Sequence, residues 1–419
     1  MIEIRPLTRL DAIVTIPGSK SLTHRALLIA ALVDGESILI NSLQSEDTNY
    51  TTQALERLGI QFLREGDLLH VFGKGGRLNG GVENIFIGNS GTSMRFLTAL
   101  VALKKGHTLL DGGERMRMRP MSDLIDGLMA LGVNAYCRDD QGCPPVIIES
   151  KGLRGGKAKV RGDKSSQFLS ALLMVAPYAE KDVECEVTGH LASKPYVKMT
   201  CEVMSNFGVE VHRSESGSFF VKAGRKYQPR RYFVEGDASN ASYFFSAAAV
   251  TRGKVRVENF RPDSIQGDSG FLNILEKMGC EIIRGDHWAE VHGKELKGIE
   301  VDMNEMPDLV PTLAVTSAFA CGKTLITNIG HLRSKESDRI SALTRELRKI
   351  GIRAEEGEDW LKVEGGKVHG AEIETYNDHR LAMSFAIAGL IAPGIKIKGE
   401  RCVDKSFPGF WEVFEEVYR

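Results

Sequence analysis

Six short apolar segments recur along the chain, and they constrain its fold more than any other feature. Their first residues are 70, 73, 75, 69 and 68 positions apart. The segments begin at Arg25, Arg95, Phe168, Tyr243, Thr312 and Arg380. Such even spacing indicates six copies of one supersecondary unit. Because each segment is apolar on nearly all sides, we expect each to form a buried helix.

An amphipathic helix pattern follows each buried segment, and five of the six end at a glycine. These glycines are Gly59, Gly132, Gly208, Gly279 and Gly351, each followed by alternating apolar residues. A glycine just past a helix is typical of a C-terminal cap, and the alternation predicts a strand. The sixth helix is expected in FPGFWEVFEEVY at residues 407–418. The unit is therefore predicted to be β-α-β-α-β-β, which gives an α/β fold.

Six units divide most simply into two domains of three. We expect units 1–3 to form a domain at residues 17–234, and units 4–6 to form a domain at residues 235–419. The strand-like stretch within residues 1–16 needs a partner, and we expect it to close the second domain. That domain, 1–16 with 235–419, would then be discontinuous.

Composition excludes several functional classes. The net charge is -1 over 419 residues, which gives no basic excess for nucleic acid. The apolar runs are too short to span a bilayer, and the N-terminal stretch lacks the apolar core of a signal peptide. The seven cysteines include no CxxC pair. We expect a cytoplasmic monomer that binds small molecules, with no cofactor and no metal.

Small and polar clusters stand at the predicted helix starts, where unpaired N–H groups can receive anions. PGSKSLTHR contains Lys20, Ser21 and Arg25, GNSGTSMR contains Gly91, and ERMRMRP ends with Arg119 before proline. GDKSSQ and ASKPY add Ser165, Ser166, Gln167 and Ser193. These residues are candidate phosphate and carboxylate ligands. Helix capping and solvated surface charge remain the alternatives.

The second half of the chain carries charged motifs. Asp308 follows MP before a buried segment, and RSKESDR contains Lys335, Glu336 and Arg339. Asp308 is a candidate general base, with capping as the alternative. Arg380 in NDHR lies in the first turn of a buried helix, where a cation opposes the helix dipole, so an anion is expected to offset it. Lys405 adds a further cation near the end of the chain.

These motifs, in this order, resemble the 5-enolpyruvylshikimate-3-phosphate (EPSP) synthase family of enolpyruvyl transferases. The resemblance extends from PGSKSLTHR through GNSGTSMR, SSQF, EGDASNASYF and RSKESDR to YNDHRLAM and KSFPG. It implies two domains of three units each, an inside-out α/β barrel fold. It also implies transfer of the carboxyvinyl group of phosphoenolpyruvate to the 5-hydroxyl of shikimate 3-phosphate, the sixth step of the shikimate pathway to chorismate and aromatic amino acids.

The resemblance also implies residue roles. The expected shikimate-3-phosphate contacts are Lys20, Ser21, Arg25, Ser165, Ser166, Gln167, Ser193, Asp308 and Lys335. The expected phosphoenolpyruvate contacts are Lys20, Gly91, Arg119, Gln167, Arg339, Arg380 and Lys405. Asp308, helped by Lys20, would take the proton from the hydroxyl, and Glu336 would protonate the methylene carbon. Domain closure would join the two groups of cations.

Two positions depart from the family pattern. His331 stands where some members have a substrate-binding asparagine, so it is not assigned a contact. Phe96 stands where many members have proline. We therefore hypothesise altered sensitivity to glyphosate, the inhibitor that competes with phosphoenolpyruvate in this family.

Two alternatives remain open. UDP-N-acetylglucosamine enolpyruvyl transferases share the fold and the donor, but they use a loop cysteine in the stretch that matches GGERMRMRP, where this chain has none. They also carry asparagine where this chain has Ser21. A non-catalytic anion-binding module on the same repeat is the second alternative, and the carboxylates Asp308 and Glu336 argue against it.

Overall fold

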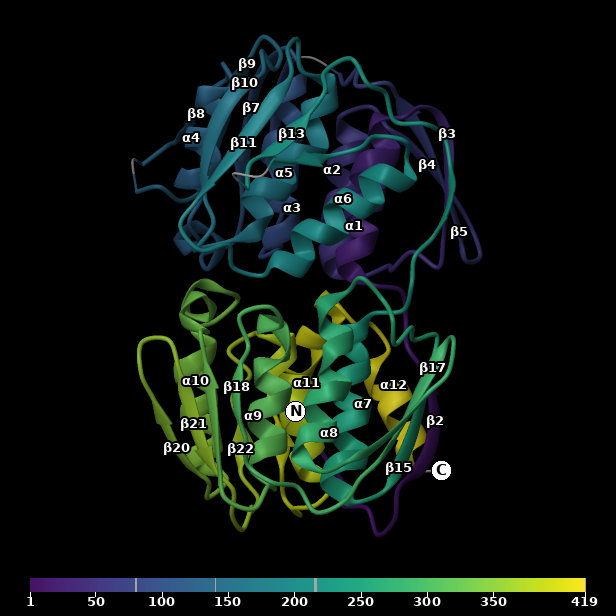
Figure 1. The fold of residues 1–419 in the computed structure, drawn as a ribbon, viewed down its shortest axis with the longest axis vertical. Helices are drawn as coiled ribbons and strands as arrows, with labels where there is room; N and C mark the ends of the chain where they lie inside the picture. Colours follow the sequence, from purple (N-terminus) through teal and green to yellow (C-terminus); the bar gives the residue numbers. More distant parts are fainter. Residues whose placement is uncertain (80, 140, 215–216, 419) are drawn as a thin grey trace. The chain divides into compact units, whose positions relative to one another are not determined.

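The computed structural model describes residues 1–79, 81–139, 141–214 and 217–418. The chain divides into two compact units (Figure 1). Unit 1 combines Met1–Pro17 with Glu235–Arg419, and unit 2 is Gly18–Val234. No described helix is long and apolar enough to cross a membrane.

Six buried helices form the interiors of the two units, as the apolar repeats predict. Unit 2 contains α1 (Lys20–Leu32), α3 (Gly91–Leu100) and α5 (Ser166–Val175). Unit 1 contains α7 (Ala238–Thr251), α9 (Val310–Ser317) and α11 (His379–Gly389). Each helix begins between one and five residues before its apolar run. Several polar residues expected ahead of the helices therefore lie within the first turn.

The three buried helices of unit 1 pack against one another and share hydroxyl groups (Figure 1). The Thr312 hydroxyl of α9 lies 3.2 Å from that of Ser242 on α7 and 3.3 Å from that of Ser384 on α11. Thr316 of α9 donates a second bond, 2.9 Å long, to Ser246 of α7. These polar groups satisfy each other, so they can be buried at little cost.

Six sheets occur among the described residues, and five of them share one strand pattern. An edge strand runs parallel to its neighbour, the neighbour pairs antiparallel with the second strand of a hairpin, and the first strand of that hairpin forms the other edge. In unit 2 the sheets are β14 (Arg231–Phe233), β3 (Asp34–Ile40), β5 (Leu68–Lys74), β4 (Gln61–Glu65); β6 (Gly81–Phe86), β7 (Gly106–Asp111), β9 (Val146–Ser150), β8 (Asn134–Cys137); and β10 (Gly156–Arg161), β11 (Val183–Thr188), β13 (Phe219–Val221), β12 (His212–Arg213).

Unit 1 repeats the pattern with one shorter sheet. Its sheets are β2 (Asp11–Thr15), β15 (Lys254–Glu258), β17 (Trp288–His292), β16 (Glu281–Arg284); β18 (Glu300–Asp302), β19 (Lys323–Thr327), β21 (Leu361–Glu364), β20 (Arg353–Glu356); and β22 (Glu372–Ile373), β23 (Lys396–Ile397), β1 (Ile2–Glu3). The buried helices lie inside these separate sheets, and the described strands form no closed barrel (Figure 1). The α/β repeat fold is the one expected.

Two strands exchange sheets. β2 precedes α1, yet it pairs in parallel with β15, in the sheet of the fourth repeat. β14 precedes α7, yet it pairs in parallel with β3, in the sheet of the first repeat. β1 likewise pairs with β23 near the end of the chain. The N-terminal residues therefore belong to the same unit as residues 235–418.

An amphipathic helix follows each buried helix, and the first five end as the sequence predicts. The amphipathic helices are α2 (Glu46–Arg57), α4 (Ser122–Ala130), α6 (Lys194–Asn206), α8 (Phe271–Met278), α10 (Arg339–Lys349) and α12 (Phe410–Glu415). The glycines after the first five have φ angles of 92°, 89°, 87°, 113° and 86°. Only glycine adopts these angles without strain, so the predicted C-terminal caps are confirmed.

Candidate active site

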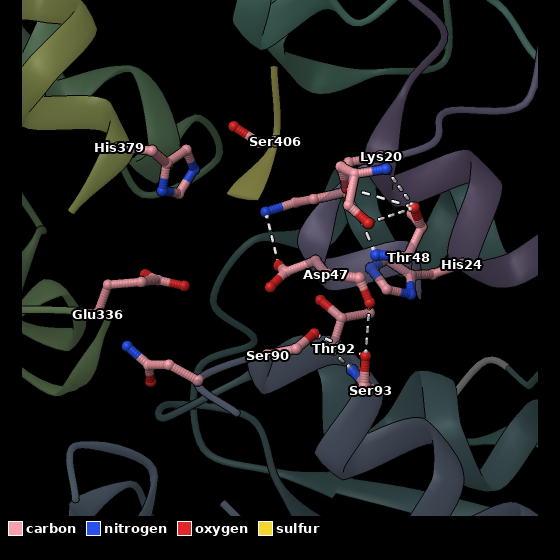
Figure 2. A network of polar contacts seen from close by, with 12 residues as sticks. Lys20, His24, Asp47, Thr48, Ser90, Thr92, Ser93, Glu336, His379 and Ser406 are labelled. Carbon is pink, nitrogen blue, oxygen red and sulfur yellow. Dashed lines mark hydrogen bonds and ion pairs between the residues drawn. The ribbon is translucent and has the colours of Figure 1, made fainter. Parts of the chain in front are cut away.

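Lys20 is the first residue of α1 and forms a buried ion pair (Figure 2). Its Nζ lies 3.1 Å from Asp47 Oδ2, and the two side chains are only 11% and 3% exposed. Asp47 belongs to the first turn of α2, and its carbonyl accepts a bond from the Ser93 hydroxyl of α3. The pair therefore holds the Lys20 ammonium at a helix start, beside the first turn of a second helix.

Arg25 is almost completely buried, and its hydrogen-bond partners are neutral. Its guanidinium donates to the Thr200 hydroxyl at 2.7 Å and to the carbonyls of Ser21 and Tyr196 at 2.9 and 3.0 Å. The guanidinium carbon, Cζ, also lies 5.3 Å from the centre of the Phe96 ring. Burial lowers the pKa of Arg25 to about 10, which still leaves it charged at neutral pH.

This environment leaves a charge to be neutralised. Within the described part of the chain, no carboxylate lies within ion-pair distance of Arg25. A buried cation is costly unless an anion compensates it. Arg25 therefore has the properties of an anion-binding residue.

Gly91 allows two arginines to approach the start of α3. A Cβ at this position would lie 2.3 Å from Arg95 Nη1 and 2.5 Å from Arg119 Nη2, which is closer than real contacts permit. Arg95 and Arg119 are both 3% exposed. Two guanidiniums thus adjoin the N–H groups of a helix N-terminus, an arrangement that favours an anion.

The start of α5 supplies hydroxyl and amide groups. Ser165 caps the helix by accepting a bond from the Gln167 N–H at 3.3 Å, and Ser166 is the buried first residue. The Gln167 amide donates to Thr92 of α3 at 3.1 Å. Ser193, in a left-handed conformation with φ 56°, precedes α6, which also supplies the Tyr196 carbonyl that contacts Arg25. Unit 2 therefore gathers most of its predicted residues at the starts of α1, α3, α5 and α6, and Arg119, which follows the 3-10 turn Met116–Met118, reaches the start of α3 with its side chain.

Asp308 is the centre of the charged group in unit 1. It lies in a single 3-10 turn, Pro307–Leu309, just before α9. Its carboxylate accepts bonds from Arg380 at 2.7 Å and from Arg339 at 3.0 Å. Burial alone would raise the pKa of the Asp308 carboxyl, but Arg380, Lys335 and Arg339 outweigh it and hold that pKa well below its usual range. The anion expected to offset Arg380 is thus a carboxylate of the chain itself.

Arg339 begins α10 and bonds to three carboxylates. Its Nε lies 2.8 Å from Asp378 Oδ2, and its other nitrogens reach Asp308 at 3.0 Å and Glu336 at 2.9 Å. Although burial opposes its charge, these carboxylates raise the pKa of Arg339 above its ordinary value. Glu336 is 9% exposed. The expected proton donor, Glu336, and the expected base, Asp308, are therefore linked through one guanidinium.

The remaining predicted cations border this group. Lys335 lies between the 3-10 turn Gly330–Ser334 and α10, and its charge acts on both Asp308 and His331. Burial, with Lys335, lowers the pKa of His331 to about 4, so its imidazole is neutral at neutral pH. This suits a position where some relatives carry a neutral asparagine. Lys405 is buried at the end of the 3-10 turn Glu400–Lys405.

Sequence reasoning missed two carboxylates that organise the site. Asp47 lies in SEDT, where Ser45 and Thr48 form a capping box at the start of α2. Asp378 lies in NDHR beside the predicted Arg380. It is fully buried, caps α11 through the Arg380 N–H, and accepts from Ser337 and Arg339. The described residues contain no group of three or more His, Cys, Asp or Glu side chains placed to hold a metal.

Comparisons with known proteins extend over nearly the whole chain. Residues 4–414 match the family model described as EPSP synthase (3-phosphoshikimate 1-carboxyvinyltransferase). The 3-phosphoshikimate 1-carboxyvinyltransferase of Nostoc punctiforme is 49% identical over 420 residues, covering 99% of each chain. The enzyme of that name from Haemophilus influenzae (strain PittGG) is 42% identical, covering 99% of this chain and 98% of its own.

Solved structures resemble the chain over a similar extent. The EPSP synthase of Acinetobacter baumannii superimposes with a TM-score of 0.82 at 28% identity, covering 99% of this chain and 97% of that one. The match thus includes all six repeats and every candidate site residue. The chain belongs to the EPSP synthase family.

Proposed function

We propose that this chain transfers the carboxyvinyl group of phosphoenolpyruvate to the 5-hydroxyl of shikimate 3-phosphate and releases phosphate. The observation that carries the proposal is the family match over residues 4–414, within which each motif expected for this reaction is present. Both substrates carry a phosphate and a carboxylate. The buried cations at helix starts are suited to such doubly anionic ligands.

The acceptor is assigned mainly to unit 2. Arg25 is the residue with the clearest need of an external anion, because its partners are hydroxyl and carbonyl groups. We assign the acceptor phosphate and hydroxyls to Arg25, Lys20, Ser21, Ser165, Ser166, Gln167 and Ser193, with Asp308 and Lys335 at the reacting hydroxyl. The donor is assigned to Lys20, Gly91, Arg119, Gln167, Arg339, Arg380 and Lys405.

The reaction proceeds by addition and elimination. The 5-hydroxyl oxygen bonds to carbon 2 of phosphoenolpyruvate as Asp308 takes its proton, and Glu336 adds a proton to carbon 3. The tetrahedral intermediate then loses phosphate from carbon 2 and a proton from carbon 3, which restores the double bond. Buried guanidinium and ammonium groups stabilise the charge that develops on the phosphate and carboxylate oxygens.

Asp308 needs activation before it can act as a base. In the structure its charge is stabilised by Arg380 and Arg339, which makes it a weak proton acceptor. Those guanidiniums are also the proposed ligands of phosphoenolpyruvate. When the donor anion engages them, the Asp308 carboxylate loses part of this stabilisation and becomes more basic. Donor binding would then prepare the base.

The UDP-sugar alternative requires a reactive cysteine, and the structure offers little support for one. Cys137 is buried, and burial raises the pKa of the Cys143 thiol, which makes its thiolate less available. We also propose that the chain acts as a monomer in the cytoplasm on small molecules.

One assay tests the proposed reaction. Phosphate release is measured with phosphoenolpyruvate and each of three acceptors: shikimate 3-phosphate, shikimate and UDP-N-acetylglucosamine. We expect release only with shikimate 3-phosphate. Release only with the UDP-sugar would establish the alternative, and no release with any acceptor would refute transfer by this chain.

A further inference from the structure

Helix α10 holds the turn between β22 and α11 at two points. At its first residue, the Arg339 guanidinium bonds to Asp378, the N-cap of α11. Two helical turns later, the Glu346 carboxylate of the same helix accepts a bond from the Glu374 N–H, at the start of the loop that follows β22. The segment between these attachments leads directly to Arg380.

Glu346 is a buried carboxylate that takes no part in the proposed chemistry. It is 0% exposed, yet three donors reach it. The Glu374 N–H lies 3.0 Å from Oε2, the Tyr376 hydroxyl lies 2.7 Å from Oε1, and Lys349 Nζ lies 2.8 Å from Oε2. Hydrogen bonds to a charged acceptor are the stronger kind, so this carboxylate fixes both the backbone at 374 and the side chain at 376.

The turn that Glu346 holds has an uncommon backbone. Tyr376 and Asn377 are consecutive residues with φ angles of 52° and 55°, in the left-handed region. Asparagine adopts this conformation fairly readily, whereas a bulky residue such as Tyr376 keeps it only where its surroundings impose it. A further bond closes the turn, from the Asp378 N–H to the Thr375 carbonyl at 2.8 Å. The conformation of the turn decides where Asp378 and Arg380 point.

We propose that Glu346 is a positioning residue for phosphoenolpyruvate, which acts by holding Glu374 and Tyr376 so that the turn presents Arg380 to the donor. The inference rests on the proposed function, in which Arg380 binds the donor. The competing interpretation is that Glu346 only stabilises the fold. The two differ in their effect on donor affinity, because loss of stability alone does not select one substrate.

The test uses the full chain and a matched pair of tyrosine variants. Tyr376→Phe removes the hydroxyl that bonds to Glu346 at 2.7 Å. Tyr418→Phe, in the same unit, removes a hydroxyl that bonds to the Arg5 carbonyl at the same distance of 2.7 Å. A further variant, Glu346→Gln, removes the charge of the Glu346 side chain and keeps its shape. The measurements are KM for each substrate, kcat and the melting temperature.

We expect Tyr376→Phe and Glu346→Gln to raise KM for phosphoenolpyruvate about tenfold, the effect of losing one bond to a charged group. KM for shikimate 3-phosphate should stay unchanged, and Tyr418→Phe should leave both values unchanged. An unchanged donor KM in Tyr376→Phe, or an equal rise for both substrates, would overturn the inference. If Glu346→Gln does not fold, Tyr376→Phe decides alone. An unmodified chain that forms no product refutes the proposed function instead, so the two failures are distinct.

Discussion

Arg380 Nη2 lies 2.7 Å from Asp308 Oδ2, so a proposed donor ligand and the proposed general base are ion-paired with each other. Asp308→Asn keeps the shape of the side chain but removes both its charge and its basicity. We expect kcat to fall by about 100-fold or more, the usual contribution of a general base. KM for phosphoenolpyruvate should not rise, because Arg380 and Arg339 lose a competing carboxylate. Steady-state kinetics with both substrates measures these values, and a kcat within tenfold of the unmodified chain would exclude the assigned role.

Arg25→Lys tests the acceptor assignment. Lysine keeps the charge but cannot reproduce the fork of bonds to Thr200, Ser21 and Tyr196. We expect KM for shikimate 3-phosphate to rise about tenfold or more, and KM for phosphoenolpyruvate to change much less. Titration calorimetry with shikimate 3-phosphate provides an independent measurement. An equal affinity of Arg25→Lys and the unmodified chain for shikimate 3-phosphate would show that Arg25 does not bind this substrate.

Phe96 gives a prediction about inhibition by glyphosate. It is 1% exposed in α3, and its ring supports the Arg25 guanidinium where many family members have proline. Because the residue lies on the helix that Gly91 begins, we expect glyphosate to inhibit this chain less strongly than proline-bearing members. The inhibition constant against phosphoenolpyruvate is the measurement. A value as low as in those members would contradict the hypothesis.

Asp268 predicts how stability depends on pH. It is buried beside the Ser239 hydroxyl, and burial, together with the charge of Asp308, raises its pKa to about 7. The folded chain therefore keeps a proton on Asp268 at pH values where the unfolded chain has lost it. This favourable contribution is present at low pH and is lost as pH rises from about 4 to about 7.

Asp268→Asn removes this dependence. We expect the unfolding free energy of the unmodified chain to fall across that range by on the order of 1–4 kcal/mol more than that of the variant. Denaturant unfolding at pH 5 and pH 8 measures the difference. Parallel changes in the two proteins would show that Asp268 titrates normally.

Local patterns in the sequence predicted the repeating elements well. The positive φ angles at Gly59, Gly132 and the three equivalent glycines follow from the C-terminal caps, which a glycine just past each helix predicts. The burial of α7 and α11 follows from helices that are apolar on all sides. Such features depend on neighbours within a few residues, so a sequence can reveal them.

Long-range side-chain partners could not be predicted in the same way. Arg339 meets Asp308 and Asp378, which are 31 and 39 residues away, and Lys20 meets Asp47 27 residues away. Nothing in RSKESDR indicates that its last arginine is already surrounded by carboxylates. The sequence did predict that the N-terminal stretch joins the second domain, as β2 does by pairing with β15, but it gave no sign that β14 pairs with β3 of the first repeat. These contacts depend on the assembled fold.

The pairing of the first strands has a consequence for the chain as it leaves the ribosome. β2 must wait for β15 at residues 254–258, and β1 for β23 at residues 396–397. At ordinary rates of translation the second delay is on the order of tens of seconds. All the residues of unit 2 emerge in between, so that unit has the opportunity to fold first. The earliest of these strands to be made are thus among the last to be placed.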